Sequence, residues 1–179
     1  MVEKLKESPK NWVVFLFIAI GLIICISLIL FVFSNLPSVP YGIVDYEFAW
    51  SIEHVQAIFA AWGSEGISAH ILGVWWDFLF IFGYSLLVSG CILLVVRMNS
   101  EQISSIGIFL IIVPFIAGLF DAVENSFLLV MLKNPVEINP VFPIVATISA
   151  GVKFGLLILG VAYFLIGLIL GLIQKVRNR

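Results

Sequence analysis

Residues 103–132 have the sequence ISSIGIFLIIVPFIAGLFDAVENSFLLVML, in which the only charged residues are Asp121 and Glu124. A helix that crosses the hydrocarbon core of a membrane needs about 20 mostly apolar residues, and this stretch is long enough. Ionisable side chains inside a bilayer are costly, so they usually face a protein interior or a hydrated cavity and mark a functional site. The stretch therefore predicts a membrane-spanning helix with a buried polar site.

Three other runs are long enough to cross a membrane. Residues 13–33 have no charge, residues 71–96 include only Asp77, and residues 141–173 include only Lys153. The chain of 179 residues is 62% hydrophobic and 11% charged, whereas an average soluble domain has about 25% charged residues. We therefore expect an all-α polytopic membrane protein, with one integral membrane domain over residues 1–179 folded as a bundle of four transmembrane helices.

The distribution of Lys and Arg in the short loops predicts the orientation of the chain. The first loop has no Lys or Arg, and Lys133 is the single basic residue of the third loop. The basic residues of the opposite side are Lys4, Lys6, Lys10, Arg97, Lys175, Arg177 and Arg179. We expect a multi-pass protein of the cell membrane with both termini in the cytoplasm and the first loop, residues 34–70, outside.

The first loop is predicted to contain a short amphipathic helix. Ser51 has the character of a helix N-cap and Gly63 that of a C-terminal cap. The apolar residues that fall on one face between them are Ile52, Val55, Phe59 and Trp62. Such a helix either lies on the outer membrane surface or packs as a cap over the bundle, and the sequence leaves both alternatives open.

The polar residues of three spans are expected at overlapping depths. At about 1.5 Å per residue, Asp77 lies roughly 9 Å and Tyr84 roughly 20 Å from the outer surface, and Lys153 roughly 18 Å from it. Residues 121–125 lie at roughly 10 to 17 Å. We therefore expect one inward polar cluster, open towards the outside, that contains Asp77, Tyr84, Asp121, Glu124, Asn125, Ser149 and Lys153, with His70 at its outer mouth.

Two kinds of role for this cluster follow from its residue types. It either fixes helix packing through a buried ion pair, or it titrates protons, because crowded carboxylates in a low dielectric have raised pKa values. A titrating site would serve acid–base chemistry on a lipid or other amphiphile, or proton- or ion-coupled transport. The candidate catalytic residues are Asp121, Glu124 and Lys153, and the candidate ligand-binding residues are Asp77, Tyr84, Asn125, Ser149 and His70.

A metal site is a further alternative. Asp77, Asp121, Glu124 and Asn125 offer the oxygen ligands that Mg²⁺, Mn²⁺ or Ca²⁺ prefer, but the nearby Lys153 would repel a cation. We assign no metal ligand and predict no cofactor. The expected partners are membrane lipids, with a homo-oligomer as a further possibility. No nucleic-acid partner is expected, because the net charge is −2 and the chain has no basic patch.

Small residues and proline suggest how the spans pack. Gly151 with Gly155, and Gly167 with Gly171, form two G-x-x-x-G patterns, which allow helices to approach closely. Pro114 predicts a kink in the third span. The uncharged first span is expected to pack on the outside of the bundle or at an interface between copies.

The order of the polar motifs resembles that of a group of small prokaryotic four-span membrane proteins of unknown function. The resemblance covers residues from about Val44 to about Leu165. The motifs that carry it are Asp77-Phe78-x-Phe80-x-x-x-Tyr84, Ala117-Gly118-x-x-Asp121-x-x-Glu124-Asn125 and Ser149-x-x-x-Lys153. The resemblance implies the four-span architecture and a shared polar set, and it implies no particular activity.

Overall fold

The computed structural model describes residues 7–99 and 101–177, all of whose regular elements are helices. Four helical segments are long and apolar enough to cross a membrane, which confirms the expected all-α class. In chain order the elements are α2 (Asn11–Phe31), η1 (Phe33–Asn35), α3 (Ile43–Glu47), α4 (Ile52–Met98), α5 (Glu101–Leu110), α6 (Val113–Lys133) and α7 (Val141–Arg177). Lys4, Lys6 and Arg179, on which the predicted orientation partly rests, lie outside the described residues.

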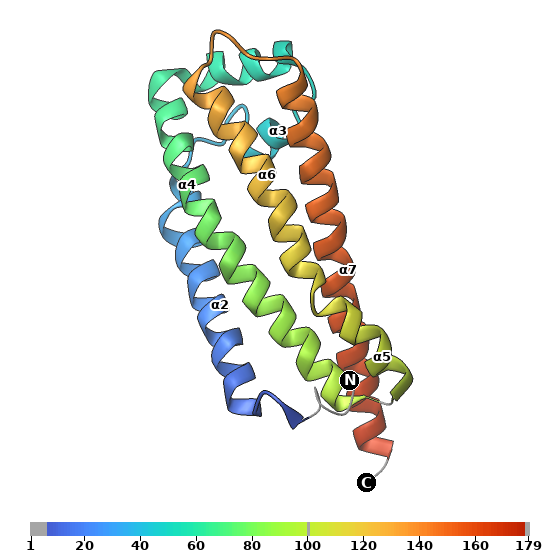
Figure 1. The fold of residues 1–179 in the computed structure, drawn as a ribbon. Coiled ribbons are helices and arrows are strands. Elements are labelled where there is room, and N and C mark those ends of the chain that lie inside the picture. The colour runs from blue at the N-terminus through green and yellow to red at the C-terminus, as the bar shows by residue number, and fades with distance from the viewer. Residues whose placement is uncertain (1–6, 100, 178–179) are drawn as a thin grey trace.

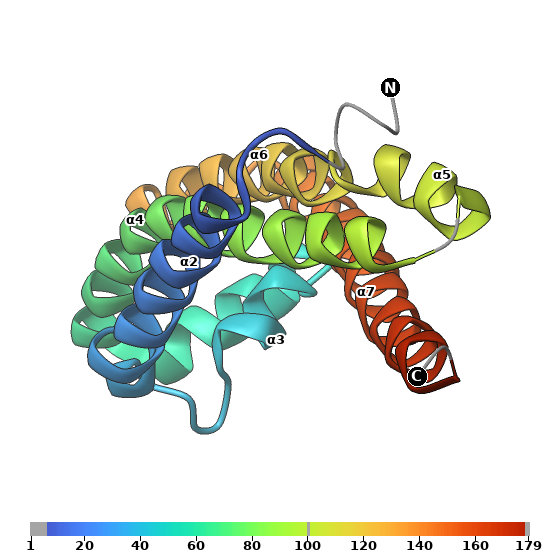
Figure 2. The same cartoon turned by 90° about the horizontal axis from the view of Figure 1, so that it is seen from below.

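The spans follow one another in a curved row. Helix α2 packs along α4, α4 along α6, and α6 along α7, while α4 also contacts α7 (Figure 1). The uncharged α2 therefore lies at the margin of the bundle, as expected. Viewed along the spans, α3 lies on the concave side of the row, between α2 and α7 (Figure 2). We call the end of the bundle where α3 lies the α3 end; α2 begins and α7 finishes at the opposite end.

Glycine allows α2 to approach α4 closely. A Cβ atom added to Gly21 would lie 2.5 Å from the carbonyl oxygen of Gly83 and 2.7 Å from the backbone nitrogen of Leu87. No side chain larger than hydrogen fits between two backbones at that distance. The contact between these two spans therefore depends on Gly21.

The predicted loop helix forms the first part of α4. The Ser51 hydroxyl accepts a hydrogen bond from His54 N–H at 3.3 Å, as expected of an N-cap. Gly63 interrupts the helix with φ 62° and ψ −175°, a conformation that favours glycine. The helix resumes immediately after Gly63, so it extends on the N-terminal side of the span predicted for residues 71–96.

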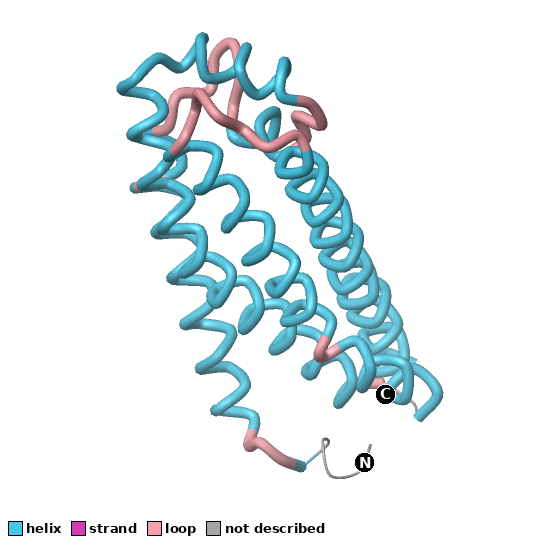
Figure 3. The backbone as a smooth tube through the Cα atoms, turned by 45° about the horizontal axis from the view of Figure 1, so that its top comes forward, coloured by secondary structure: helices cyan, strands magenta, loops and turns pink. Residues whose placement is uncertain are grey.

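Residues 52–62, which we call the α4 cap, lie across the α3 end of the bundle (Figures 1 and 3). The apolar face of the cap is buried in the core. The core residues that the cap contributes are Val55, Ile58, Phe59 and Trp62, and they pack with Tyr46, Leu128 and Leu132. Packing over the bundle is therefore observed, and the position of this helix on the outer membrane surface stays a prediction that is compatible with it.

The third span is broken at the predicted proline kink. Proline has no N–H to donate within a helix, and two residues, Ile111 and Ile112, separate α5 from α6. Two hydroxyls of α4 bind carbonyls at the break: Ser89 Oγ donates to Ile111 O at 2.7 Å, and Ser85 Oγ donates to Pro114 O at 3.2 Å. Side-chain donors of this kind let a broken helix exist at membrane depth.

Only one of the two G-x-x-x-G patterns takes part in packing within the chain. A Cβ atom on Gly167 would collide with Val95, and Asn99 Nδ2 donates to Gly167 O at 2.9 Å. By contrast, added Cβ atoms on Gly151 and Gly155 would meet nothing within 4 Å. The second pattern thus joins α7 to α4, whereas the first lies on an open face of α7.

Candidate functional site

Three hydrogen bonds fix the segment that contains α3 against the bundle. Tyr46 Oη donates to Leu128 O of α6 at 2.9 Å. Thr147 Oγ1 of α7 donates to Glu47 O at 2.9 Å. Trp62 Nε1 of the α4 cap donates to Tyr41 O at 2.7 Å. Together they hold the last residue of α3, Glu47, where its side chain enters the interior between the spans.

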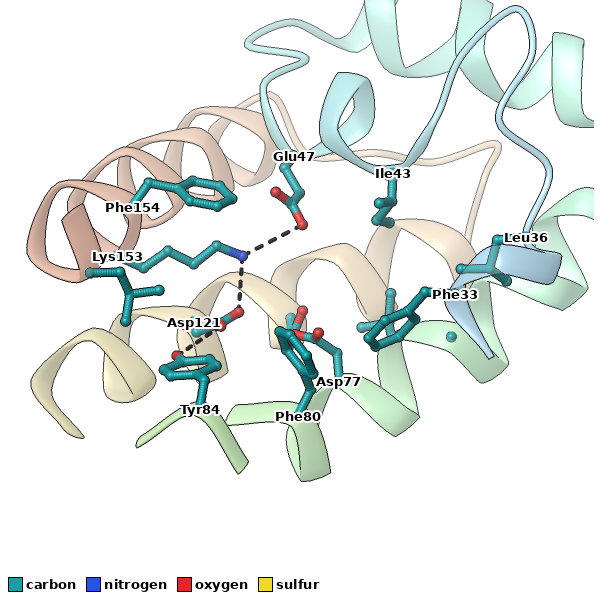
Figure 4. Close-up of a pocket in the computed structure, with 14 residues that line it drawn as sticks. Phe33, Leu36, Ile43, Glu47, Asp77, Phe80, Tyr84, Asp121, Lys153 and Phe154 are labelled. Carbon is teal, nitrogen blue, oxygen red and sulfur yellow. Dashed lines mark hydrogen bonds and ion pairs between the residues drawn. The ribbon is translucent and has the colours of Figure 1, made fainter. Parts of the chain in front are cut away.

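Lys153 is the centre of the buried polar cluster. Its Nζ atom lies 3.0 Å from Asp121 Oδ1, 2.9 Å from Glu124 Oε2 and 3.5 Å from Glu47 Oε1. Lys153 is 4% exposed and Glu124 fully buried. The three acids come from α3 and α6 and converge on a base of α7, as Figure 4 shows for Glu47 and Asp121.

Two further contacts extend the cluster to α4. Tyr84 Oη donates to Asp121 Oδ2 at 2.9 Å, so Asp121 accepts from Tyr84 and Lys153 through different oxygens. Asn125 Nδ2 donates to Asp77 Oδ2 at 2.7 Å. The Asp77 carboxylate is thus held by an amide and stands outside the set of acids bound to Lys153.

A cavity of about 210 Å³ opens beside the cluster. Its lining has polar and apolar residues, which we call the polar wall and the apolar wall, and Figure 4 labels members of both. The polar wall contains Glu47, Asp77, Tyr84, Asp121, Asn125 and Lys153. The apolar wall contains Phe33, Leu36, Ile43, Gly73, Val74, Phe80, Phe154 and Leu157.

An apolar groove on α7 adjoins this cavity. The residues that line the groove are Phe154, Leu157, Ile158, Val161, Ala162 and Leu165. Phe154 and Leu157 also line the cavity. The groove runs from the cavity along α7 for roughly 12 Å, taking 1.5 Å per residue, away from the α3 end. The polar cavity and this apolar surface of α7 thus share two lining residues.

The cluster has an excess of acidic groups. If all its members were ionised, the four carboxylates of Glu47, Asp77, Asp121 and Glu124 would face the single ammonium of Lys153, which leaves three negative charges. Burial raises the pKa of the Glu47 carboxyl above its usual range, the Lys153 ammonium opposes this rise, and the Asp121 carboxylate adds to it. Buried charges need partners, so the excess must be compensated by protons or by a bound cation.

Five of the candidate residues line the cavity, and three do not. Those that line it are Asp77, Tyr84, Asp121, Asn125 and Lys153. Glu124 binds Lys153 from behind the cavity wall. Ser149 is buried on α7 but is not part of the lining. The expected depths brought these side chains to about the same level, but they did not determine which of them reach the cavity.

His70 lies elsewhere than at the mouth of the cluster. Its ring stacks on Trp62 with centroids 3.6 Å apart and an interplanar angle of 8°. Its Nδ1 atom lies 2.8 Å from Gly66 O, and the residue is fully buried. His70 therefore packs the α4 cap onto the rest of α4 and does not line the cavity.

Glu47 is the member of the site that the sequence analysis missed. It lies in the first loop, where an acidic residue is normally solvent-exposed, yet it is 8% exposed. The sequence feature that could have indicated its burial is its position between two aromatic residues, Tyr46 and Phe48. An acid within such an apolar stretch requires a buried partner, and Lys153 supplies it.

Among the described residues, no three His, Cys, Asp or Glu side chains are grouped so that they could hold a metal ion. The geometry explains this, because the Lys153 ammonium occupies the point on which Glu47, Asp121 and Glu124 converge. The carboxylates of this site are thus already arranged around a nitrogen cation.

Comparisons with known protein families, with curated proteins and with solved structures find no match. The chemistry of the site must therefore be argued from its own geometry.

Proposed function

We propose that this chain is a multi-pass membrane protein that binds a small amphiphile, with the polar end in the cavity and the apolar chain in the groove on α7. The observation that carries the proposal is the continuity of the two surfaces through Phe154 and Leu157. Ligand sites typically combine an apolar lining with a few convergent polar groups, and this cavity has both.

The direction of the groove fits a membrane lipid. The acidic groups lie towards the α3 end, and the groove extends from them towards the middle of α7. A lipid of the leaflet at the α3 end would place its headgroup and its chain in the same order. The cavity volume of about 210 Å³ accommodates a small polar group rather than a whole lipid.

The polar wall would also support acid–base chemistry. The Asp121 carboxylate is held by Tyr84 and Lys153, which leaves it oriented and charge-compensated. Asp77 accepts a hydrogen bond from the amide of Asn125, and among the described residues it is not one of the carboxylates paired with Lys153, so its proton is free to be exchanged with a ligand. Asp77 is therefore our candidate proton donor or acceptor, with Asp121 and Lys153 stabilising charge on the ligand.

The excess of carboxyl groups supports a second candidate function, proton-coupled transport. Groups that change protonation within a membrane commonly serve proton relays. Proton uptake driven by a ligand gradient in proteoliposomes would favour transport. Conversion of the ligand without flux would favour an enzyme.

We expect Leu157→Trp to displace a bound amphiphile, because the larger ring would fill the point where cavity and groove meet. An overpacked site costs about 1–3 kcal/mol, which corresponds to roughly 5-fold to 150-fold weaker binding. The measurement is native mass spectrometry of protein released from lipid nanodiscs. The matched control is Ile166→Trp, since Ile166 lies on the same helix, is 59% exposed and lines neither surface. Equal occupancy in the two variants would contradict the proposed site.

The proposed orientation places the α3 end outside the cell. A cysteine introduced at Ser64, which is exposed beside the α4 cap, should react with an impermeant thiol reagent added to intact cells. The control is Ser8→Cys, because Ser8 is exposed at the opposite end. It should react only after lysis. The reverse labelling pattern would overturn the orientation and leave the site itself unaffected.

A further inference from the structure

We infer that the membrane surface crosses α4 at Trp75 and Trp76, level with the cavity, and that residues 52–70 stand outside the bilayer. The inference concerns the surface that meets the lipid headgroups. It goes beyond the proposed function, because it holds with or without a bound amphiphile. It is also independent of which side of the cell the α3 end faces.

One exposed face of α4 changes from polar to apolar along its length. Residues three or four apart lie on the same face of a helix. Trp75 and its neighbour Trp76 lie at the change, and tryptophan is enriched at membrane–water interfaces. Beyond them, Leu79 and Phe82 are apolar and 40% and 53% exposed. The exposed residues of the face, in chain order, are Glu65, Ser68, Leu72, Trp75, Leu79 and Phe82.

The end of α2 reaches its polar limit at the same level. Phe33 packs against Phe80 with ring centroids 5.4 Å apart. Leu36 lies 2.7 Å from the position that a Cβ atom on Gly73 would take. The exposed polar residues 34 and 35 lie between these two contacts in the chain, and so do the two tryptophans of α4. Two antiparallel helices thus lose their apolar surface at one level.

The distance to the opposite end of both helices matches a bilayer. Trp12 is 65% exposed near the start of α2, and Arg97 donates a hydrogen bond to the adjacent Asn11. At about 1.5 Å per residue, α2 covers roughly 32 Å from Trp12 to Phe33. The same rise gives roughly 32 Å from Trp76 to Arg97 on α4. The hydrocarbon core of a typical bilayer is about 30 Å thick, so both helices fit it between these limits.

A basic side chain reaches the same level from α6. Lys133 is the last residue of α6, and its Nζ atom lies 5.4 Å from the centroid of the Trp75 ring. Lysine near the end of a span extends its ammonium group to the interface, and a cation over an aromatic face is attracted to it. The pair therefore fits the headgroup layer.

The part of α4 beyond the tryptophans has no face suited to a membrane. Between residues 51 and 71, all of which the structure describes, no large apolar side chain is exposed. A helix that lies on a membrane inserts side chains such as Trp, Phe or Leu, whereas the apolar residues of the α4 cap are buried in the core. Gly63 lies roughly 18 Å from Trp75 along the helix. The cap thus stands clear of the membrane surface rather than on it.

This position places the cavity at the depth of the lipid headgroups. Asp77, which follows Trp76 in the chain, lines the cavity. Phe33 and Leu36, from the end of α2, line it as well. A polar ligand from the headgroup layer would therefore reach the depth of the cavity without crossing the hydrocarbon core.

The test measures depth with a nitroxide label on the full chain in nanodiscs. Relaxation of the label by oxygen, which concentrates in hydrocarbon, is compared with relaxation by a water-soluble nickel complex. The native cysteines are removed by Cys25→Ala and Cys91→Ala. The labelled positions are then introduced one at a time as Ser68→Cys, Leu79→Cys and Phe82→Cys on α4, with Ile23→Cys and Ser34→Cys on the α2 side.

We expect the label at Ser68 roughly 12 Å outside the surface, and those at Leu79 and Phe82 roughly 5 Å and 9 Å inside it, at about 1.5 Å per residue from Trp76. Nickel should dominate the relaxation at Ser68 and oxygen that at Phe82. The reference is Ile23, which is 65% exposed near the middle of α2 and should be the deepest position. Ser34 should lie within about one helical turn of the surface.

Three results would overturn the inference. Oxygen-dominated relaxation at Ser68 would show that α4 is embedded up to the cap. Nickel-dominated relaxation at Phe82 would place the surface deeper along α4. A label at Ser34 as deep as the one at Ile23 would separate the limit of α2 from that of α4. Because two helices are probed, a variant of one that fails to assemble leaves the other to decide, and the amphiphile site is tested separately by Leu157→Trp.

Discussion

Lys153→Met is expected to destabilise the folded protein by about 3–5 kcal/mol, the usual cost of removing one partner from a buried ion pair. The substitution keeps an unbranched side chain of similar length but leaves Glu47, Asp121 and Glu124 without their shared cation. These carboxyls would have to become protonated or hydrated. The measurement is thermal unfolding in detergent, followed by circular dichroism.

A compensating variant and a control make this result specific. Lys153→Met combined with Asp121→Asn and Glu124→Gln should recover most of the lost stability, because neutral amides need no cation. Lys175→Met, which removes the same charge from an exposed position of α7, should leave the unfolding curve unchanged. If Lys153→Met were as stable as Lys175→Met, the carboxyls would already be neutral in the folded protein, and the ion-pair account of the cluster would be wrong.

Gly21→Val is expected to separate α2 from α4, with a loss of about 1–3 kcal/mol from overpacking. The added atoms would meet the backbone of Gly83 and Leu87, which cannot move aside as a flexible side chain can. The consequence extends to the cavity, because Phe33 and Leu36 follow α2 in the chain and form part of its apolar wall. Unfolding and amphiphile occupancy should therefore both change.

Gly151→Val is the matched control for this substitution. It introduces the same β-branched residue into another helix, and so has the same intrinsic helix cost, but its Cβ would meet nothing within 4 Å. Stability equal to that of Gly21→Val would show that the close approach of α2 and α4 is not needed. A change in oligomeric state confined to Gly151→Val would indicate that two copies associate through the open face of α7.

Much of the fold could be predicted because it depends on local properties of the sequence. Apolar length alone locates the four membrane-length helices, Pro114 locates the break in the third, and Ser51 and Gly63 locate the limits of the α4 cap. Each of these features follows from hydrophobicity or backbone chemistry within a few residues. The charges of α4, α6 and α7 could likewise be expected to converge, since a membrane interior allows few other arrangements.

The composition of the site could be predicted only in part. Helical spacing placed Asp121, Glu124 and Asn125 on one face, but it did not show that Glu124 would lie behind the cavity wall and Asn125 in front of it. It also assigned His70 to the cluster, whereas stacking on Trp62 holds the ring in the cap. A shift of one helical position decides whether a side chain reaches the cavity. The packing of the neighbouring helices determines that position.

The class of the protein, the number of membrane-length helices and the excess of acids over bases inside them follow from amino-acid composition along the chain. Each of these properties depends on which residues occur within a short stretch of the chain, and contacts between distant residues do not alter it. Only the tertiary structure brought Glu47 from a loop to Lys153, a partner 106 positions further along the chain. It also joined a polar cavity to the groove on α7. Such contacts depend on how a connecting segment returns to the bundle, which is decided by packing and hydrogen bonds between residues far apart in the chain.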